Sequence, residues 1–145
     1  MAHNYWLFKT EPSTYSFAQL VRDGKTNWNG VRNFQARNFL KQVAVGDQAL
    51  IYHSGDDKGV VGIARVARAG YPDPDSKKPG DWVQIDLAFE ASFKRPVALK
   101  EIKATPALAD LPLIKQSRLS CMPVTLSDFK LLVKLGSSPA LTAKK

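Results

Sequence analysis

The stretch "WVQIDLAFEASF", residues 82–93, constrains the fold of this chain more than any other. Successive side chains of a strand point to opposite faces, so its alternation predicts a β-strand with one buried and one mostly exposed face. A strand of this length usually curves, as barrel strands do. The buried face would carry Val83, Ile85, Leu87, Phe89, Ala91 and Phe93, and the other face Trp82, Gln84, Asp86, Ala88, Glu90 and Ser92.

Four other segments are also predicted to be strands. Three of them are rich in β-branched and aromatic residues and are bounded by turn-forming residues, whereas residues 117–125 alternate weakly. Two glycines in the third segment, Gly59 and Gly62, predict a bend or a close approach of neighbouring backbone. The four predicted strands are residues 5–9, 47–54, 59–71 and 117–125.

Two helices are predicted between the early strands. Ser16 and Gln19 form a capping-box pattern and Gly24 is a natural stop, so a short helix is expected over 16–23. The next helix should begin near Asn33 and end before Gly46. One face of it is an apolar stripe, whereas Phe34 and Arg37 fall on the polar face; the stripe is Ala36, Phe39, Leu40 and Val43.

The C-terminal third is mostly helical by pattern. Short helices are expected over 97–104 and 106–115, and Thr125 with Asp128 caps a last helix that Gly136 ends. Strands with short helices between them predict an α+β fold: a curved β-barrel of about five to six mostly antiparallel strands, with helices packed around its rim. We expect one domain over residues 1–136 and a flexible tail over 137–145.

Charge is distributed unevenly along the chain, whose net charge is +8 and pI about 9.7. Residues 1–93 hold eleven Lys and Arg against ten Asp and Glu, whereas residues 94–145 hold ten against three. Such a surplus favours an anionic partner, nucleic acid first, although it also serves solubility alone.

Several classes of protein are disfavoured by what the sequence lacks. Cys121 is the single cysteine, so a disulfide within the chain is excluded and a reducing, cytoplasmic location is expected. No signal peptide or membrane span is recognisable. His3, His53 and Cys121 are too scattered for a structural zinc site. We expect a monomer without a metal or cofactor.

Polar and aromatic residues gather at three predicted strand ends. If these ends meet, they form a pocket with an aromatic wall, cations and hydrogen-bonding groups, which suits an extruded nucleobase. Each residue also has a structural alternative: Trp28 as core, Asn33 as a helix cap, Glu11 as a turn cap. The three groups are Lys9, Thr10 and Glu11; Trp28, Asn29, Arg32 and Asn33; and Tyr52, His53 and Ser54.

Catalytic signatures are weak. The sequence has no nucleophile elbow, P-loop or H-E-x-x-H motif. Lys9, Thr10 and Glu11 could in principle supply a hydroxyl nucleophile with a base and an acid. Adjacent strand residues point to opposite faces, however, so Thr10 would oppose the other two unless the strand has ended.

Five motifs in order resemble those of the EVE domain family: "YWLFKTEP", "WNGVRNFQARNFL", "IYHSG", "GVVGIARVARAGYPDP" and "SRLSCMPVT". The resemblance runs from about residue 4 to 133. It implies a PUA-like fold related to YTH and ASCH domains, and recognition of a modified nucleobase, such as a modified cytosine, in DNA or RNA.

The resemblance also implies roles for particular residues. Trp28 is similar to the cage Trp of YTH domains, and Arg118 and Ser120 match the closing-strand motif. We expect Trp28 to stack on the base. The edge of the base would be read by Thr10, Asn33 and Ser54, and phosphate would be bound by Lys9, Arg32 and Arg118.

Two departures from the family pattern bear on base preference: Thr10 replaces a commoner Ser, and Asn29 a commoner Asp. Two other functions stay open. ASCH-type relatives imply a hydrolase of acylated or otherwise modified nucleosides. The basic C-terminal third alternatively predicts a protein-interaction module.

Overall fold

The computed structural model describes residues 4–11, 13, 15–28, 34–54, 58–72, 83–109, 111–115 and 121–137, and the side chains of all of these except 34–37 and 71–72. Five predicted site residues lie outside the described residues, as does Trp82 of the long strand. The five are Asn29, Arg32, Asn33, Arg118 and Ser120.

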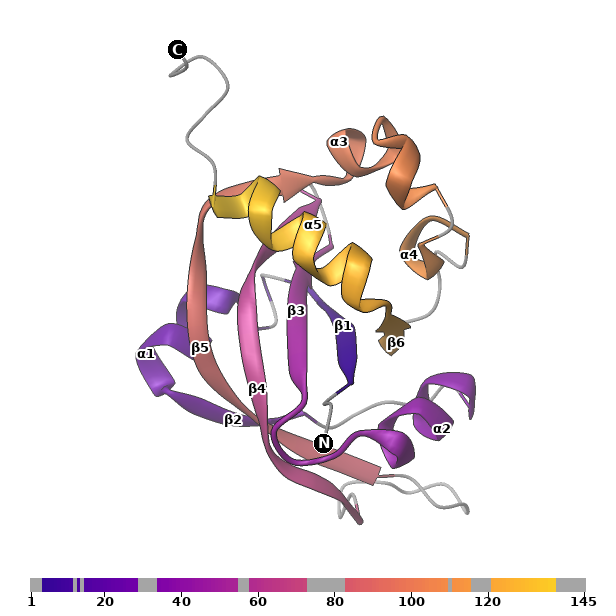
Figure 1. The fold of residues 1–145 in the computed structure, drawn as a ribbon. Coiled ribbons are helices and arrows are strands. Elements are labelled where there is room, and N and C mark those ends of the chain that lie inside the picture. Colours follow the sequence, from indigo (N-terminus) through magenta and orange to yellow (C-terminus); the bar gives the residue numbers. More distant parts are fainter. Residues whose placement is uncertain are drawn as a thin grey trace.

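A curved six-stranded sheet forms the centre of the molecule (Figure 1). Its strand order is β2-β5-β4-β3-β1-β6, and each pairing is antiparallel except β1 with β3, which is parallel. The strands are β1 (Tyr5–Thr10), β2 (Lys25–Trp28), β3 (Gln48–His53), β4 (Gly59–Pro72), β5 (Val83–Ala98) and β6 (Cys121–Val124).

Short helices surround the sheet. α5 lies across the front of the sheet in Figure 1, and α1 connects β1 to the edge strand β2. The helices are α1 (Phe17–Asp23), α2 (Phe34–Gln42), α3 (Leu99–Lys103), the 3-10 turn η1 (Pro106–Leu108), α4 (Pro112–Lys115) and α5 (Leu126–Ser137). Within the described part of the chain, none of these helices is both long and apolar enough to cross a membrane.

The sheet curls until strands that are distant in its order come together. β1 and β2 are separated by β3, β4 and β5, yet the rings of Phe8 and Trp28 are 6.0 Å apart. Register shifts along β4 and β5 supply the bends that such curvature needs. The predicted α+β class with a curved, mostly antiparallel sheet is confirmed. Among the described residues the curl does not close, because β2 and β6 remain edge strands.

The long strand continues further than its sequence pattern indicated. A helix was expected from residue 97, but β5 runs to Ala98, and Val97 is buried as the alternation of the strand requires. Pro96 is tolerated because the ladder with β4 is irregular between the Val60 and Gly62 pairings. Gln84, expected on the wet face, is buried instead and accepts a hydrogen bond from Asn27 Nδ2 at 3.0 Å.

Glycines decide two close contacts. A Cβ at Gly62 would lie 2.8 Å from the Ala91 carbonyl oxygen and would also overlap the Phe17 ring, which confirms the expected close approach of backbone in β4. The prediction that Gly136 ends the last helix is wrong. α5 continues to Ser137, and a Cβ at Gly136 would lie 2.1 Å from the Phe93 ring, so this glycine lets the helix pass close over β5.

Capping follows the sequence. Ser16 Oγ accepts from Gln19 N and the Gln19 side chain accepts from Ser16 N, so the capping box of α1 is confirmed. Thr125 Oγ1 accepts from Asp128 N at 3.2 Å at the start of α5. Both caps bind backbone N–H groups that have no partner within the helix.

A buried carboxylate ties the start of β1 to the turn before β3. Asp47 is 1% exposed and accepts the Trp6 indole N–H at 2.9 Å, the Ala44 amide at 2.9 Å and the Asn4 amide at 3.0 Å. Three donors compensate the loss of hydration of this charge.

Candidate nucleic-acid interface

A pocket of about 490 Å³ opens where β1 ends. Residues 9–11 all line it, and β1 ends at Thr10, the middle one of the three. The rest of the lining comes from the approach to α1 and from β2. The lining residues are Lys9, Thr10, Glu11, Tyr15, Thr26, Asn27 and Trp28.

Two aromatic rings form one corner of the pocket. Trp28 is half-buried, and Tyr15 meets it nearly at right angles (89°), with ring centroids 6.4 Å apart. The Trp28 ring is also stacked on Phe8, at 30° between ring planes. Two rings at right angles offer a flat base both a stacking surface and an edge contact.

Tyr15 is held in place by hydrogen bonds at its side-chain hydroxyl and at its backbone carbonyl. Its hydroxyl donates to Asp23 Oδ2 at 2.9 Å, and its carbonyl accepts from Thr10 Oγ1 at 2.6 Å. Burial is the main cause that raises the pKa of Tyr15. The side chain is therefore a neutral phenol at physiological pH.

Lys9 brings positive charge to the pocket. Its Nζ lies 5.8 Å from the centroid of the Tyr52 ring, a cation–π contact. Burial, and then repulsion from Lys58, lower the pKa of Lys9. An anion bound beside Lys9 would favour its ammonium form and offset the repulsion from Lys58.

The third predicted group supports the pocket instead of lining it. Tyr52 is 3% exposed and lies under Lys9. His53 Nε2 accepts the Phe17 amide at 2.9 Å, so it anchors the first turn of α1 to β3. Ser54 donates to the Thr10 carbonyl through both its amide, at 2.9 Å, and its hydroxyl, at 3.3 Å.

Three lining residues were not expected from the sequence: Tyr15, Thr26 and Asn27. β2 has only four residues, "KTNW", too few to show alternation, and its pairing with β5 is what brings Thr26 and Asn27 to the pocket. Of these three, only Tyr15 could have been predicted to line the pocket, because it is an aromatic residue between the end of a strand and a capped helix.

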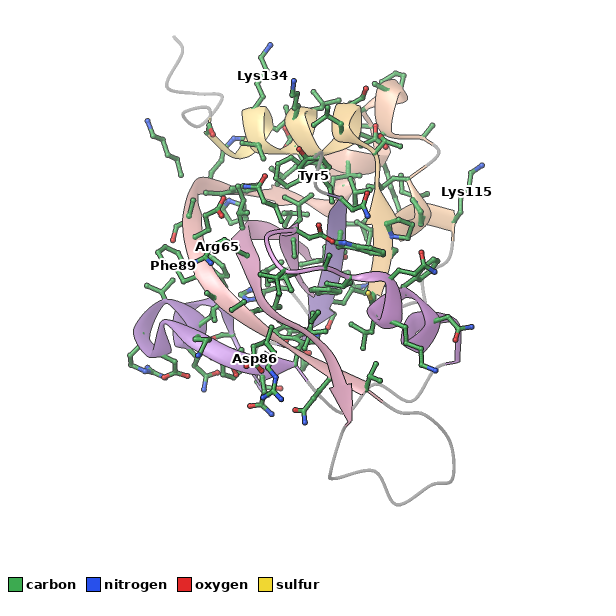
Figure 2. The ribbon with its side chains drawn as sticks, turned by 60° about the horizontal axis from the view of Figure 1, so that its bottom comes forward. Tyr5, Arg65, Asp86, Phe89, Lys115 and Lys134 are labelled. Atoms are coloured by element: carbon green, nitrogen blue, oxygen red, sulfur yellow. The ribbon has the colours of Figure 1, made fainter. Side chains whose placement is uncertain are left out.

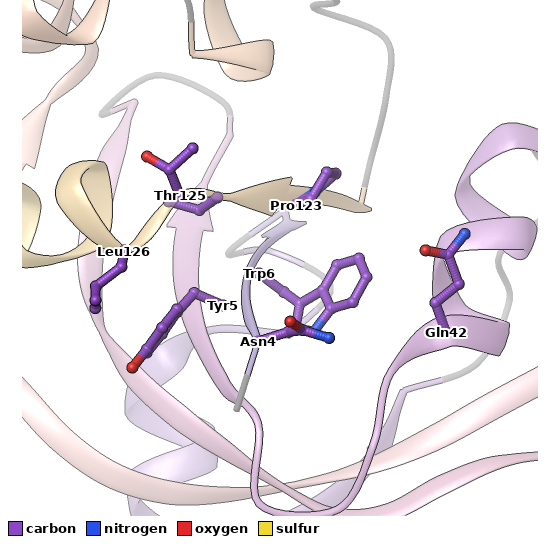
Figure 3. A pocket seen from close by; sticks show the side chains of 8 residues that line it. Asn4, Tyr5, Trp6, Gln42, Pro123, Thr125 and Leu126 are labelled. Atoms are coloured by element: carbon purple, nitrogen blue, oxygen red, sulfur yellow. The ribbon is translucent and has the colours of Figure 1, made fainter. Parts of the chain in front are cut away.

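A second pocket, of about 420 Å³, lies at the other end of β1 (Figure 3). The Trp6 indole points toward Gln42 of α2, while Tyr5 lies near Leu126 at the start of α5. Among the described residues that line it, no side chain is charged: they are Asn4, Tyr5, Trp6, Gln42, Pro123, Val124, Thr125 and Leu126. This described lining offers no cationic side chain to a phosphate.

A metal centre is not built from the described residues, which contain no group of three or more His, Cys, Asp or Glu placed to bind an ion.

The curved mixed sheet with helices at its rim defines the class of protein as a PUA-like α+β domain. The YTH domain of Zygosaccharomyces rouxii MRB1 has the same fold at 17% identity, with a TM-score of 0.60 over 94% of this chain and 88% of that one. Within this class, the chain belongs to the EVE domain family, whose profile matches residues 4–135.

Relatives extend from bacteria to mammals. Mouse thymocyte nuclear protein 1 is 33% identical, over 91% of this chain and 73% of that protein. Rpa0253 of Rhodopseudomonas palustris is 44% identical, with a TM-score of 0.86 over 92% of each chain. Human THYN1, solved in complex with DNA containing 5-methylcytosine, is 29% identical, with a TM-score of 0.85 over 94% of this chain and 99% of that one.

Proposed function

We propose that this protein is a non-catalytic nucleic-acid-binding module that recognises a modified nucleobase, such as a modified cytosine, in the pocket at the end of β1. The observation that carries the proposal is the meeting of Trp28, Lys9, Thr10 and Glu11 in one cavity. The human relative bound to 5-methylcytosine DNA supports the same class of ligand.

The base would stack on Trp28, with Tyr15 against its edge. Stacking contributes about 1–3 kcal/mol per base and needs only a flat ring, so it serves any base. Selectivity therefore depends on polar groups around the ring, and a methyl or hydroxymethyl group would be read by the shape of the pocket wall.

The groups that read the base edge differ in availability. The Thr10 hydroxyl already donates to the Tyr15 carbonyl and can only accept from a ligand. Ser54 is engaged with Thr10. Glu11, Thr26 and Asn27 also line the cavity. Asn27 donates one side-chain N–H to Gln84 but keeps its amide oxygen and a second N–H, so we assign edge recognition to these three residues.

A hydrolase of modified nucleosides is the second candidate, because Lys9, Thr10 and Glu11 share the cavity. The geometry opposes it: the Thr10 proton is given to a carbonyl and not to a base that could activate the hydroxyl. Turnover of acylated nucleosides that is lost in Lys9→Ala would establish the enzyme and overturn the reader.

The proposal is tested with oligonucleotides of one sequence, in DNA and in RNA, that carry cytosine, 5-methylcytosine or 5-hydroxymethylcytosine. We expect at least one modified form to bind more tightly than its plain counterpart. Asn27→Ala should reduce this preference, whereas Gln42→Ala, which removes an exposed amide from the second pocket, should leave it unchanged. Equal affinity for modified and plain forms would refute the proposal.

A further inference from the structure

Four lysines lie where β1 and β3 end, β4 begins and β5 ends. The ladder pairs Thr10 with His53, His53 with Gly59, and Gly59 with Ala98, so these residues form one row across the ends of four neighbouring strands. β5 leads directly into α3 at that end of the sheet. The lysines are Lys9 in the pocket, Lys58 before β4, and Lys100 and Lys103 on α3.

Lys58 is fixed against the start of α3. Its carbonyl accepts the Leu99 amide at 3.0 Å. The following residue, Gly59, lies so close to β5 that a Cβ there would be 2.8 Å from the Val97 carbonyl oxygen. Beyond the main effect of burial, repulsion from Lys58 also lowers the pKa of Lys9.

Glu101, the acidic residue of α3, is paired with Arg95 and not with a lysine of this group. Glu101 accepts from both terminal nitrogens of Arg95, at 2.8 Å each, a bidentate pair that joins α3 to β5. Lys100 and Lys103 are three residues apart on the helix, and both are exposed. Within the described part of the chain, Lys58, Lys100 and Lys103 make no ion pair.

We propose that Lys58, Lys100 and Lys103 form a phosphate track, which continues from Lys9 and binds the phosphodiester backbone beside the base. The track rests on the proposed function, because it assumes that the base occupies the pocket. Phosphate contacts by lysine carry no sequence information but position the strand. The arrangement links the basic C-terminal third to the pocket, since α3 comes from that third and begins directly after Ala98, in the row of paired residues that includes Thr10.

The test is the salt dependence of binding to the plain oligonucleotide. Each lysine–phosphate contact that is lost should reduce the slope of log K against log salt concentration by about 0.7 for a single strand or 0.9 for duplex DNA. We expect that loss in Lys58→Ala, and about twice that loss in Lys100→Ala/Lys103→Ala. The ratio of affinities for modified and plain forms should stay unchanged.

The matched control is Lys130→Ala/Lys134→Ala on α5, which removes the same charge from another surface; Figure 2 shows Lys134 pointing outward from that helix. The control should keep the wild-type slope. DNA and RNA arms distinguish the two sources of phosphodiester. Any of three results would overturn the track. The slopes could be unchanged in the track variants, or the control could show an equal fall in slope. The track variants could also lose affinity for poly-glutamate but keep their affinity for nucleic acid.

The track and the base reader fail separately. Binding that is salt-dependent and sensitive to the track lysines, but blind to modification, supports the track and refutes the reader. Discrimination of modified bases with no effect of the track lysines refutes the track alone. The five lysines substituted in this test are exposed, so the variants should fold. Thermal unfolding checks this before binding is measured.

Discussion

Replacing Trp28 with Ala should weaken binding of a preferred modified oligonucleotide by about 5- to 140-fold. The range follows from a stacking contribution of about 1–3 kcal/mol, at 1.4 kcal/mol per tenfold change in affinity. Trp28→Phe keeps a smaller ring in place and should lose less. Fluorescence anisotropy at constant salt measures all three proteins.

The same substitution also removes packing, since the Trp28 ring lies 6.0 Å from Phe8 and 6.4 Å from Tyr15. Full burial of an aromatic is worth about 3–5 kcal/mol on truncation, so a half-buried ring should cost roughly 2 kcal/mol of stability. Phe89→Ala is the matched control. Phe89 is also half-buried and lies 5.7 Å from Phe17, outside the pocket lining.

The two variants should therefore lose similar stability but differ in binding. At a temperature where both are folded, Trp28→Ala should bind weakly and Phe89→Ala should bind as the wild type does. Undiminished affinity of Trp28→Ala, or an equal loss in Phe89→Ala, would show that stacking on Trp28 does not hold the base.

Three further predictions concern stability. Burial lowers the pKa of His53, whose neutral Nε2 accepts the Phe17 amide. The stability that neutral His53 contributes is therefore present above the ordinary His pKa of 6.5 and is lost as pH falls. Between pH 7.5 and 5, Tm should fall less steeply in His53→Gln than in the wild type. Gly62→Ala should cost about 1–3 kcal/mol by denaturant unfolding, because its Cβ would collide with the Phe17 ring. Gly70→Ala, whose nearest atom would be 3.5 Å away, should cost little. Asp47→Ala should cost about 2–4 kcal/mol, since it leaves three N–H donors without their acceptor, and a smaller loss than in Asp47→Asn would contradict this account.

Local features of the fold could be read directly from the sequence. The strand over residues 83–93, the capping box at Ser16 and the cap at Thr125 each depend on a few neighbouring residues, and each is found, although Gln84 is buried against the alternation. β2 could not be found in this way. Its four residues become a strand because they pair with β5 across 57 or more positions of the chain.

The candidate site divides in the same way. The sequence alone predicted that Lys9, Thr10, Glu11 and Trp28 bind a base, and that Tyr52, His53 and Ser54 belong to a neighbouring strand and its end. Only the tertiary structure decided which of them meet: the curl of the sheet brings β2 to β1, while hydrogen bonds turn His53 and Ser54 into supports. The type of each residue sets its chemistry, but its access to a ligand depends on long-range pairing that short patterns do not encode.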